Sequence, residues 1–394
     1  MRMMILIWLA AAWLALAGGL GAGCQSVNRA AVPALLPDKL AAMDAAIRNA
    51  IAAGQCPGGV LWVEHDGTSY HRAYGSRALV PSPEPMTEDT IFDAASLTKV
   101  LATTPAVMRL VERGQVILDA PVLSYIPEFT GGGRETVTVR QLLTHTSGLP
   151  SGLPAHTVWQ GSAAAINVLC QQRLLTPPGE AFRYSDLNFI LLGELVQRRT
   201  GSPLADYVAR EFYAPLKMND TGYLPPDAKR DRIAPTERVE GRLLRGTVHD
   251  PTARRMGGVA GNAGVFTTAE DLARFARMLL NQGELDGVRL FKPETVRLMT
   301  TVQTPASLPV RRGLGWDLDS EYSAPRGDWF SAASYGHTGW TGTSLWIDPD
   351  ARTFVIFLSN RNHPDGGGNV VELRRQLGTL GAEAAGLGKP RTGN

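Results

Sequence analysis

Ser96 and Lys99 stand three residues apart in the segment FDAASLTKVLA, where Asp93 is the only other charged residue. Side chains three apart on a helix lie close together on one face. A serine hydroxyl is a weak nucleophile until a neighbouring base takes its proton, and a buried lysine can be that base because burial disfavours its ammonium form. Taken alone, the spacing also fits a helix-capping serine followed by a surface lysine.

Two further stretches favour the catalytic interpretation. Tyr184-Ser185-Asp186 lies in PPGEAFRYSDLNFILLGELV, and His337-Thr338-Gly339 lies in YGHTGWTGTSLWIDP. With Ser96-Leu97-Thr98-Lys99, these segments resemble, in the same order, the three motifs of the serine β-lactamase and penicillin-binding-protein superfamily. The resemblance runs from about Leu40 to Arg374 and points to class C β-lactamases, D,D-carboxypeptidases and related esterases. The stretch VHDPTARRMGGVAGNAGVF resembles the penicillin-binding protein 4B subgroup in particular.

The resemblance implies a role for each motif residue. Ser96 attacks a carbonyl and forms an acyl-enzyme, Lys99 removes or holds its proton, and Tyr184 passes a proton to the leaving group. The backbone N–H groups of Ser96 and Trp340 are implied as the two donors that stabilise the oxyanion.

The strand around His337 is expected to bind substrate. The Thr338 hydroxyl is implied as a partner of a substrate carboxylate. Gly339 has no side chain, so we expect a substrate to approach this strand closely.

Two positions depart from the family pattern. Asp186 stands where most relatives have asparagine, and a carboxylate beside Lys99 favours the ammonium and passes more of the work to Tyr184. Asp186 also suits the positive first turn of the helix expected from Leu187 to Leu195, and both roles can hold together. His337 stands where β-lactamases usually have lysine, and an imidazole with a pKa of ~6.5 is mostly neutral at pH 7 and attracts a carboxylate less.

Other histidines are given structural roles. His145 in THTSG is expected to be a loop residue, and His249-Asp250 a turn-forming pair. No metal-binding cluster of histidine and cysteine and no phosphate-binding loop occurs in the sequence, so we expect no metal and no cofactor.

The elements that must position these residues follow from periodicity. Apolar residues at spacings of three and four predict a helix over 38–53, and a β-rich segment around Asp66-Gly67 predicts a hairpin. Helical patterns dominate from Ser96 to about Thr300, with a kink or break expected at Pro105. Strands are expected again in GLGWDL, SYGHTGW, GTSLWIDP and RTFVIFLSN, and VVELRRQLGTLGAEA predicts a closing helix.

This order predicts an α+β fold of the β-lactamase/D,D-peptidase type. An antiparallel sheet is built from N- and C-terminal segments, flanked by helices, with a mostly helical region inserted. We expect one hydrolase domain over 38–390, with the sheet region at about 38–95 and 310–390 and the helical region at about 96–309.

The N-terminus predicts export. Arg2 precedes an apolar run from Met3 to Ala17, which is shorter than the ~20 residues of a membrane span, so residues 1–23 are expected to be a signal peptide. LGAGC resembles a lipoprotein signal with Cys24 as the lipidated residue, although Gly21 departs from that pattern. We therefore expect a periplasmic or cell-envelope lipoprotein with a tether over 24–37, and plain signal-peptide cleavage is the alternative.

Composition and charge indicate which classes of partner the chain can bind. The chain has 394 residues, of which 19% are charged, and a net charge of +2. Its basic residues form no block, so the sequence gives no support for nucleic-acid binding. Cys56 and Cys170 are expected to be buried free thiols rather than a disulfide. The oligomeric state has no signature in the sequence.

These observations predict an exported serine hydrolase acting on a small-molecule or peptidoglycan-peptide substrate. D-alanyl-D-alanine carboxypeptidase ranks first, carboxylesterase second and β-lactamase third, because the pocket walls rather than the motifs select the acyl group. A protein that keeps the fold but only binds the cell wall is the alternative from another class.

Overall fold

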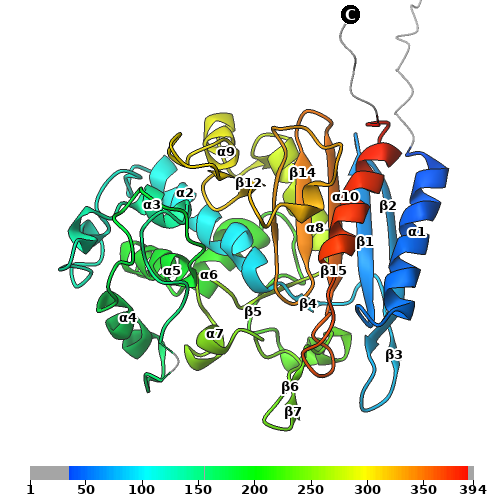
Figure 1. The fold of residues 1–394 in the computed structure, drawn as a ribbon, viewed down its shortest axis with the longest axis horizontal. Coiled ribbons are helices and arrows are strands. Elements are labelled where there is room, and N and C mark those ends of the chain that lie inside the picture. Colours follow the sequence, from blue (N-terminus) through cyan, green and yellow to red (C-terminus); the bar gives the residue numbers. More distant parts are fainter. Residues whose placement is uncertain (1–34, 155, 389–394) are drawn as a thin grey trace, which may run out of the picture. The chain divides into compact units, whose positions relative to one another are not determined.

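The two ends of the chain meet in one antiparallel sheet of eight strands, ordered β11-β12-β13-β14-β15-β1-β2-β3 (Figure 1). The structure, a computed structural model, describes residues 35–154 and 156–388. The strands of this sheet are β1 (Gly58–His65), β2 (Thr68–Ala78), β3 (Glu84–Pro85), β11 (Arg311–Arg312), β12 (Asp317–Asp319), β13 (Tyr335–Thr338), β14 (Ser344–Asp348) and β15 (Thr353–Ser359). The N-terminal strand β1 pairs with the C-terminal strand β15, which confirms the expected fold class.

The predicted hairpin joins β1 to β2. Its turn is Asp66-Gly67, and both residues have positive φ, 46° and 81°, as a tight two-residue hairpin turn requires. The predicted strand GLGWDL is wrong for its first residues, because only Asp317–Asp319 forms a strand. Gly315 has a φ of 80°, so the backbone is not extended at this residue. A Cβ there would lie 2.1 Å from the Thr104 hydroxyl oxygen, so the position also has no room for a side chain.

Helices cover both faces of the sheet. On one face α1 (Pro37–Ala52) and α10 (Val371–Ala384) pack together over β1, β2 and β15 (Figure 1). Both helices are predicted from the sequence. On the other face α8 (Ala269–Leu280) and the rest of the helical region form the larger core. Alternate residues of β1 point into the two cores, so all eight are buried.

The helical region lies between the two groups of strands in the sequence. Its helices are α2 (Thr104–Glu112), α3 (Val139–Leu143), α4 (Ser162–Cys170), α5 (Asp186–Thr200), α6 (Leu204–Val208), α7 (Pro251–Arg255) and α9 (Pro293–Thr300). Short strands accompany them: β4 (Phe92–Asp93), β5 (Gly222–Tyr223), β6 (Arg238–Val239), β7 (Arg242–Leu243), β8 (Val265–Thr267), β9 (Glu284–Leu285) and β10 (Val288–Arg289). Pro105 is the second residue of α2, where its missing N–H costs nothing, so the expected break precedes it.

Several N-terminal predictions lie outside the described residues, namely the signal peptide, most of the tether and the lipidation of Cys24. Within residues 35–154 and 156–388, no helix is long and apolar enough to cross a membrane. Cys56 and Cys170 are both buried and free, as predicted.

Candidate active site

Ser96 follows a strained residue in a tight loop at the end of β4. Ala95 has a φ of 47°, which is unfavourable for a residue with a side chain and recurs at functional sites. The Asp93 carboxylate holds this conformation by accepting the Ala95 N–H at 2.9 Å. The turn Ala95–Leu97 is a 3₁₀ helix in which Leu97 donates the first backbone bond, to Ala94. The N–H of Ser96 precedes that bond and therefore has no partner within the turn.

Lys99 begins a π-helical turn, Lys99–Thr103, rather than continuing an α-helix. Its side chain is fully buried, and its Nζ donates to Ser96 Oγ at 3.0 Å, Asp186 Oδ1 at 2.7 Å and the Asn262 carbonyl at 3.0 Å. These bonds use all three ammonium donors. The predicted pairing of Ser96 with a buried Lys99 is therefore present.

The pKa of Lys99 is raised in the resting site, in the direction expected from a carboxylate at Asp186 rather than from burial alone. Burial alone disfavours the ammonium, but the Asp186 carboxylate and the Tyr184 phenol outweigh it and raise the pKa of Lys99 above its usual value. Lys99 thus rests as an ammonium that donates to Ser96.

The Tyr184 ring covers Lys99, with Nζ 5.1 Å from the ring centroid. Its other neighbours are His145, stacked at 4.4 Å, and Tyr322, at 5.2 Å. His145 is buried and accepts the Ser185 N–H at Nδ1, and burial together with the nearby Arg312 and Lys99 charges lowers its pKa well below the usual value. His145 is therefore a neutral support beneath Tyr184, in line with the structural role expected for it.

Asp186 has both of its proposed roles. It is the first residue of α5, where a negative charge suits the helix N-terminus, and its carboxylate accepts from Lys99.

Asp186→Asn is expected to make Lys99 a better base. Losing the carboxylate removes the main interaction that raises the pKa of Lys99, so the free amine forms at lower pH. The rising limb of acylation rate against pH should then move to lower pH, and the rate at pH 7 should rise about tenfold, the factor that one unit of pKa represents. Stopped-flow acylation by an activated ester measures this. Asp186→Glu keeps the charge and is the control. An unchanged pH profile for Asp186→Asn would mean that Asp186 stabilises only the start of the helix and does not control the charge of Lys99.

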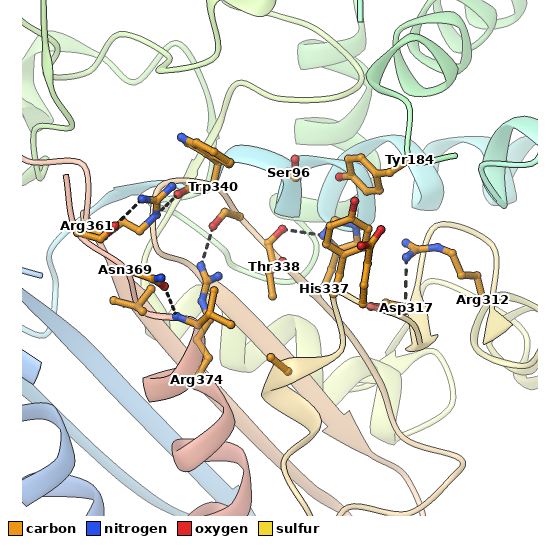
Figure 2. A pocket seen from close by; sticks show the side chains of 17 residues that line it. Ser96, Tyr184, Arg312, Asp317, His337, Thr338, Trp340, Arg361, Asn369 and Arg374 are labelled. Carbon is orange, nitrogen blue, oxygen red and sulfur yellow. Dashed lines mark hydrogen bonds and ion pairs between the residues drawn. The ribbon is translucent and has the colours of Figure 1, made fainter. Parts of the chain in front are cut away.

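The end of β13 forms the opposite wall. His337, Thr338, Gly339 and Trp340 line the same cavity as Ser96 and Tyr184 (Figure 2). The reason expected for Gly339 is wrong, because the space for its Cβ is filled by protein and not kept open for substrate. A Cβ there would lie 2.1 Å from the Thr343 hydroxyl oxygen and 2.5 Å from the Ala94 carbonyl oxygen.

Two threonine hydroxyls tie this wall to the loop before Ser96. Thr341 donates to the Asp93 carbonyl at 2.7 Å, and Thr343 donates to the Ala94 carbonyl at 3.0 Å. The turn after β13 and the nucleophile loop are thereby fixed relative to each other.

His337 is neutral. Burial, reinforced by the Arg312 and Lys99 charges, lowers its pKa well below the usual value. Its Nδ1–H donates to the Thr338 carbonyl at 2.8 Å. The expectation of a mostly neutral imidazole at this position therefore agrees with its surroundings.

Three arginines in the cavity were missed by the sequence reasoning. The cavity has a volume of about 440 Å³, and Arg312, Arg361 and Arg374 line it (Figure 2). Arg374 had a signal, because it falls on the buried face of α10 together with Leu373 and Leu377. Arg312 and Arg361 had none, since they lie in irregular or short segments.

Positive charge exceeds negative charge in this cavity. The two acidic residues of its lining are Asp317 and Glu321, and Asp317 pairs with Arg312 at 3.4 Å. Arg361 and Arg374 form no ion pair within the part of the chain that the structure describes, and they donate instead to backbone carbonyls. The site thus combines a serine nucleophile with a surplus of guanidinium groups.

Comparisons with known proteins show the family and the fold. A family model described as "Beta-lactamase" matches residues 43–379. The chain is 34% identical to an "N-acetylmuramyl-L-alanine amidase" of Bacillus subtilis (strain 168), covering 85% of each chain, and 30% identical to a "Putative D-alanyl-D-alanine carboxypeptidase" of Escherichia coli (strain K12), covering 83% of each. A penicillin-binding protein homologue from Caulobacter crescentus superposes with a TM-score of 0.72 at 24% identity, covering 89% of this chain and 98% of that one. "A class C beta-lactamase" also gives 0.72, at 19% identity and with 91% and 97% covered, and both likenesses concern the fold.

Proposed function

This chain is a serine hydrolase that belongs to the β-lactamase family, and we propose that it acts as a D-alanyl-D-alanine carboxypeptidase on peptidoglycan-type peptides. The observation that carries the proposal is the Lys99 ammonium, which joins Ser96 to Asp186 beneath a cavity rich in arginine. Ser96 and Lys99 supply the groups for acyl transfer, and the arginines of the cavity supply affinity for a substrate carboxylate.

The proposed reaction has two stages. The reaction needs the free amine of Lys99, which forms when the resting ammonium releases a proton to solvent. This amine takes the proton of Ser96 Oγ as Oγ attacks the peptide carbonyl, and the proton then passes by way of Tyr184 to the leaving amine as the C–N bond breaks. Water then attacks the resulting ester, and its proton returns to Ser96. The N–H groups of Ser96 and Trp340 stabilise the oxyanion of both tetrahedral intermediates.

The arginine surplus favours a carboxylate next to the scissile bond. A peptide that ends in D-Ala-D-Ala has its free carboxylate one residue beyond the carbonyl that Ser96 attacks. Guanidinium groups bind carboxylates with charge-assisted hydrogen bonds, and they do so more strongly in a partly desolvated cavity. Arg312 is paired with Asp317 and Arg374 is bonded to backbone carbonyls, so the neutral His337 leaves this work to Arg361 and to the Thr338 hydroxyl, while the other two arginines add positive charge.

The names of the relatives describe two different amide bonds. One is the terminal bond of a D-alanyl-D-alanine peptide, and the other joins N-acetylmuramic acid to L-alanine. Only the first has a free carboxylate beside it, so the charge of the cavity favours the carboxypeptidase.

Release of D-alanine from matched peptides tests the proposal. A peptide ending in D-Ala-D-Ala should be cleaved about 100-fold more efficiently than its C-terminal amide, because the amide offers no negative charge to Arg361 and the positive cavity. Ser96→Ala should abolish cleavage of both. Equal cleavage of acid and amide, or cleavage only of a muramyl amide, would refute the carboxypeptidase, and rapid hydrolysis of nitrocefin would place β-lactamase first.

Export is part of the same proposal. Peptidoglycan lies outside the cytoplasm, and in this proposal the signal-like residues before Cys24 direct export and Cys24 carries the lipid anchor.

A further inference from the structure

Arg374 is a buried cation without a carboxylate partner among the described residues. It projects from α10 and is 7% exposed, and burial together with the neighbouring Arg361 charge lowers its pKa to about 9. Burying such a charge is costly unless its donors are used. Its Nη2 donates to two backbone carbonyls, Gly339 at 2.7 Å and Thr343 at 2.8 Å.

The Gly339 carbonyl belongs to the same peptide unit as the Trp340 N–H. That bond is not one of the cis peptides, which within the described chain are Val80-Pro81 and His363-Pro364. In a trans peptide, the C=O and the N–H point in opposite directions. A carbonyl held by Arg374 on one side therefore turns the Trp340 N–H away from Arg374. In Figure 2, Arg374 lies below Thr338 and Trp340, whereas Ser96 lies above Thr338.

We propose that Arg374 is a positioning residue for the oxyanion site: it orients and polarises the Gly339–Trp340 peptide, so that its N–H is preorganised for the oxyanion. This inference rests on the proposed acyl-enzyme chemistry and adds a residue that no motif contains. A hydrogen bond from a charged donor draws electron density from the carbonyl, and this makes the N–H of the same peptide a stronger donor.

A purely structural role of Arg374 predicts a different result from a role in positioning the oxyanion donor. Arg374 also bridges the turn between β13 and β14, where Gly339 N–H donates to the Thr343 carbonyl at 2.7 Å and Gly342 N–H donates to the Gly339 carbonyl at 3.2 Å. If Arg374 served only this turn, its loss would lower thermal stability without a specific effect on the transition state. If it serves the oxyanion, its loss must lower kcat more than it raises KM, because the negative charge develops only in the transition state.

The test uses an activated p-nitrophenyl ester and a boronic acid that forms a tetrahedral adduct with serine. Arg374→Met should lower kcat 10- to 100-fold with KM within about threefold, which is less than the 10²–10³ lost when an oxyanion donor is removed outright. Boronate affinity should fall by a similar factor. Arg374→Lys keeps one charged donor and should recover part of both losses.

Arg375→Met is the matched control, because Arg375 is the next residue of α10 but is exposed and pairs with Asp328. It should keep the parent values for the ester and the boronate. Reduced thermal stability of Arg374→Met with unchanged kcat and boronate affinity would overturn the positioning role, as would equal effects of Arg374→Met and Arg375→Met. A parent protein that neither cleaves the ester nor binds the boronate would refute the acyl-enzyme chemistry, and the positioning role with it.

Discussion

Lys99→Ala is expected to lower the rate of acylation at least ~10³-fold at every pH from 6 to 10, within the ~10² to 10⁴ that one acid–base group contributes. The Nζ of Lys99 is the one charged donor bonded to Ser96 Oγ in the described chain, and it lies 2.7 Å from Asp186. Without it, the proton of Ser96 loses its route to the leaving group. Pre-steady-state measurement of acyl-enzyme formation, by rapid quench and mass spectrometry, gives the rate directly.

Folding must be checked separately, because Lys99 also bonds the Asn262 carbonyl inside the protein. Lys99→Arg keeps a positive charge next to Asp186 but cannot lose its proton, so it should be about as inactive as Lys99→Ala while staying closer to the parent in thermal stability. Acylation of either variant within tenfold of the parent rate would remove Lys99 from the mechanism.

Tyr184→Phe is expected to lower kcat by about 10² to 10³ while KM changes little, because general acid–base groups act on the transition state. Phenylalanine keeps the ring that stacks on His145 and covers Lys99, so the change isolates the hydroxyl. The loss should be larger for an amide than for an activated ester, since an amide leaving group needs its proton and an aryl oxide does not. Steady-state kinetics on a matched amide and ester measure the difference.

Tyr207→Phe is a matched control, because its hydroxyl is buried and has no hydrogen-bond partner within the described residues, and Tyr207 does not line the cavity. It should behave as the parent. If Tyr184→Phe lowered amide and ester turnover equally, Tyr184 would not protonate the leaving group.

Local patterns were enough to predict the hairpin and the terminal helices, and the three motifs followed from the family resemblance. The Asp66-Gly67 turn, the β-rich segments beside it and the helices α1 and α10 each depend on neighbours in the sequence, and the structure contains all of them. A single sheet shared by the N- and C-terminal segments is predicted from the positions of the strands along the chain, and the pairing of β1 with β15 shows how they join.

Features that depend on long-range contacts could not be predicted in this way. Gly339 needs its missing Cβ because Ala94, some 245 residues earlier, packs against it, which only the folded chain shows. The charge of Lys99 depends on how burial balances Asp186 and Tyr184, and composition cannot weigh these terms. The partners of Arg374 are likewise backbone atoms, which carry no sequence signature.

The central claim is that Ser96 becomes covalently acylated, and the mass of the intact protein after incubation with a fluorescent penicillin tests it most directly. The parent should gain the mass of one penicillin, and Ser96→Ala should gain none, with the label mapped to the peptide that contains Ser96. Labelling of Ser96→Ala to the same extent as the parent, or no adduct on the parent with penicillin or with an activated ester, would contradict the account.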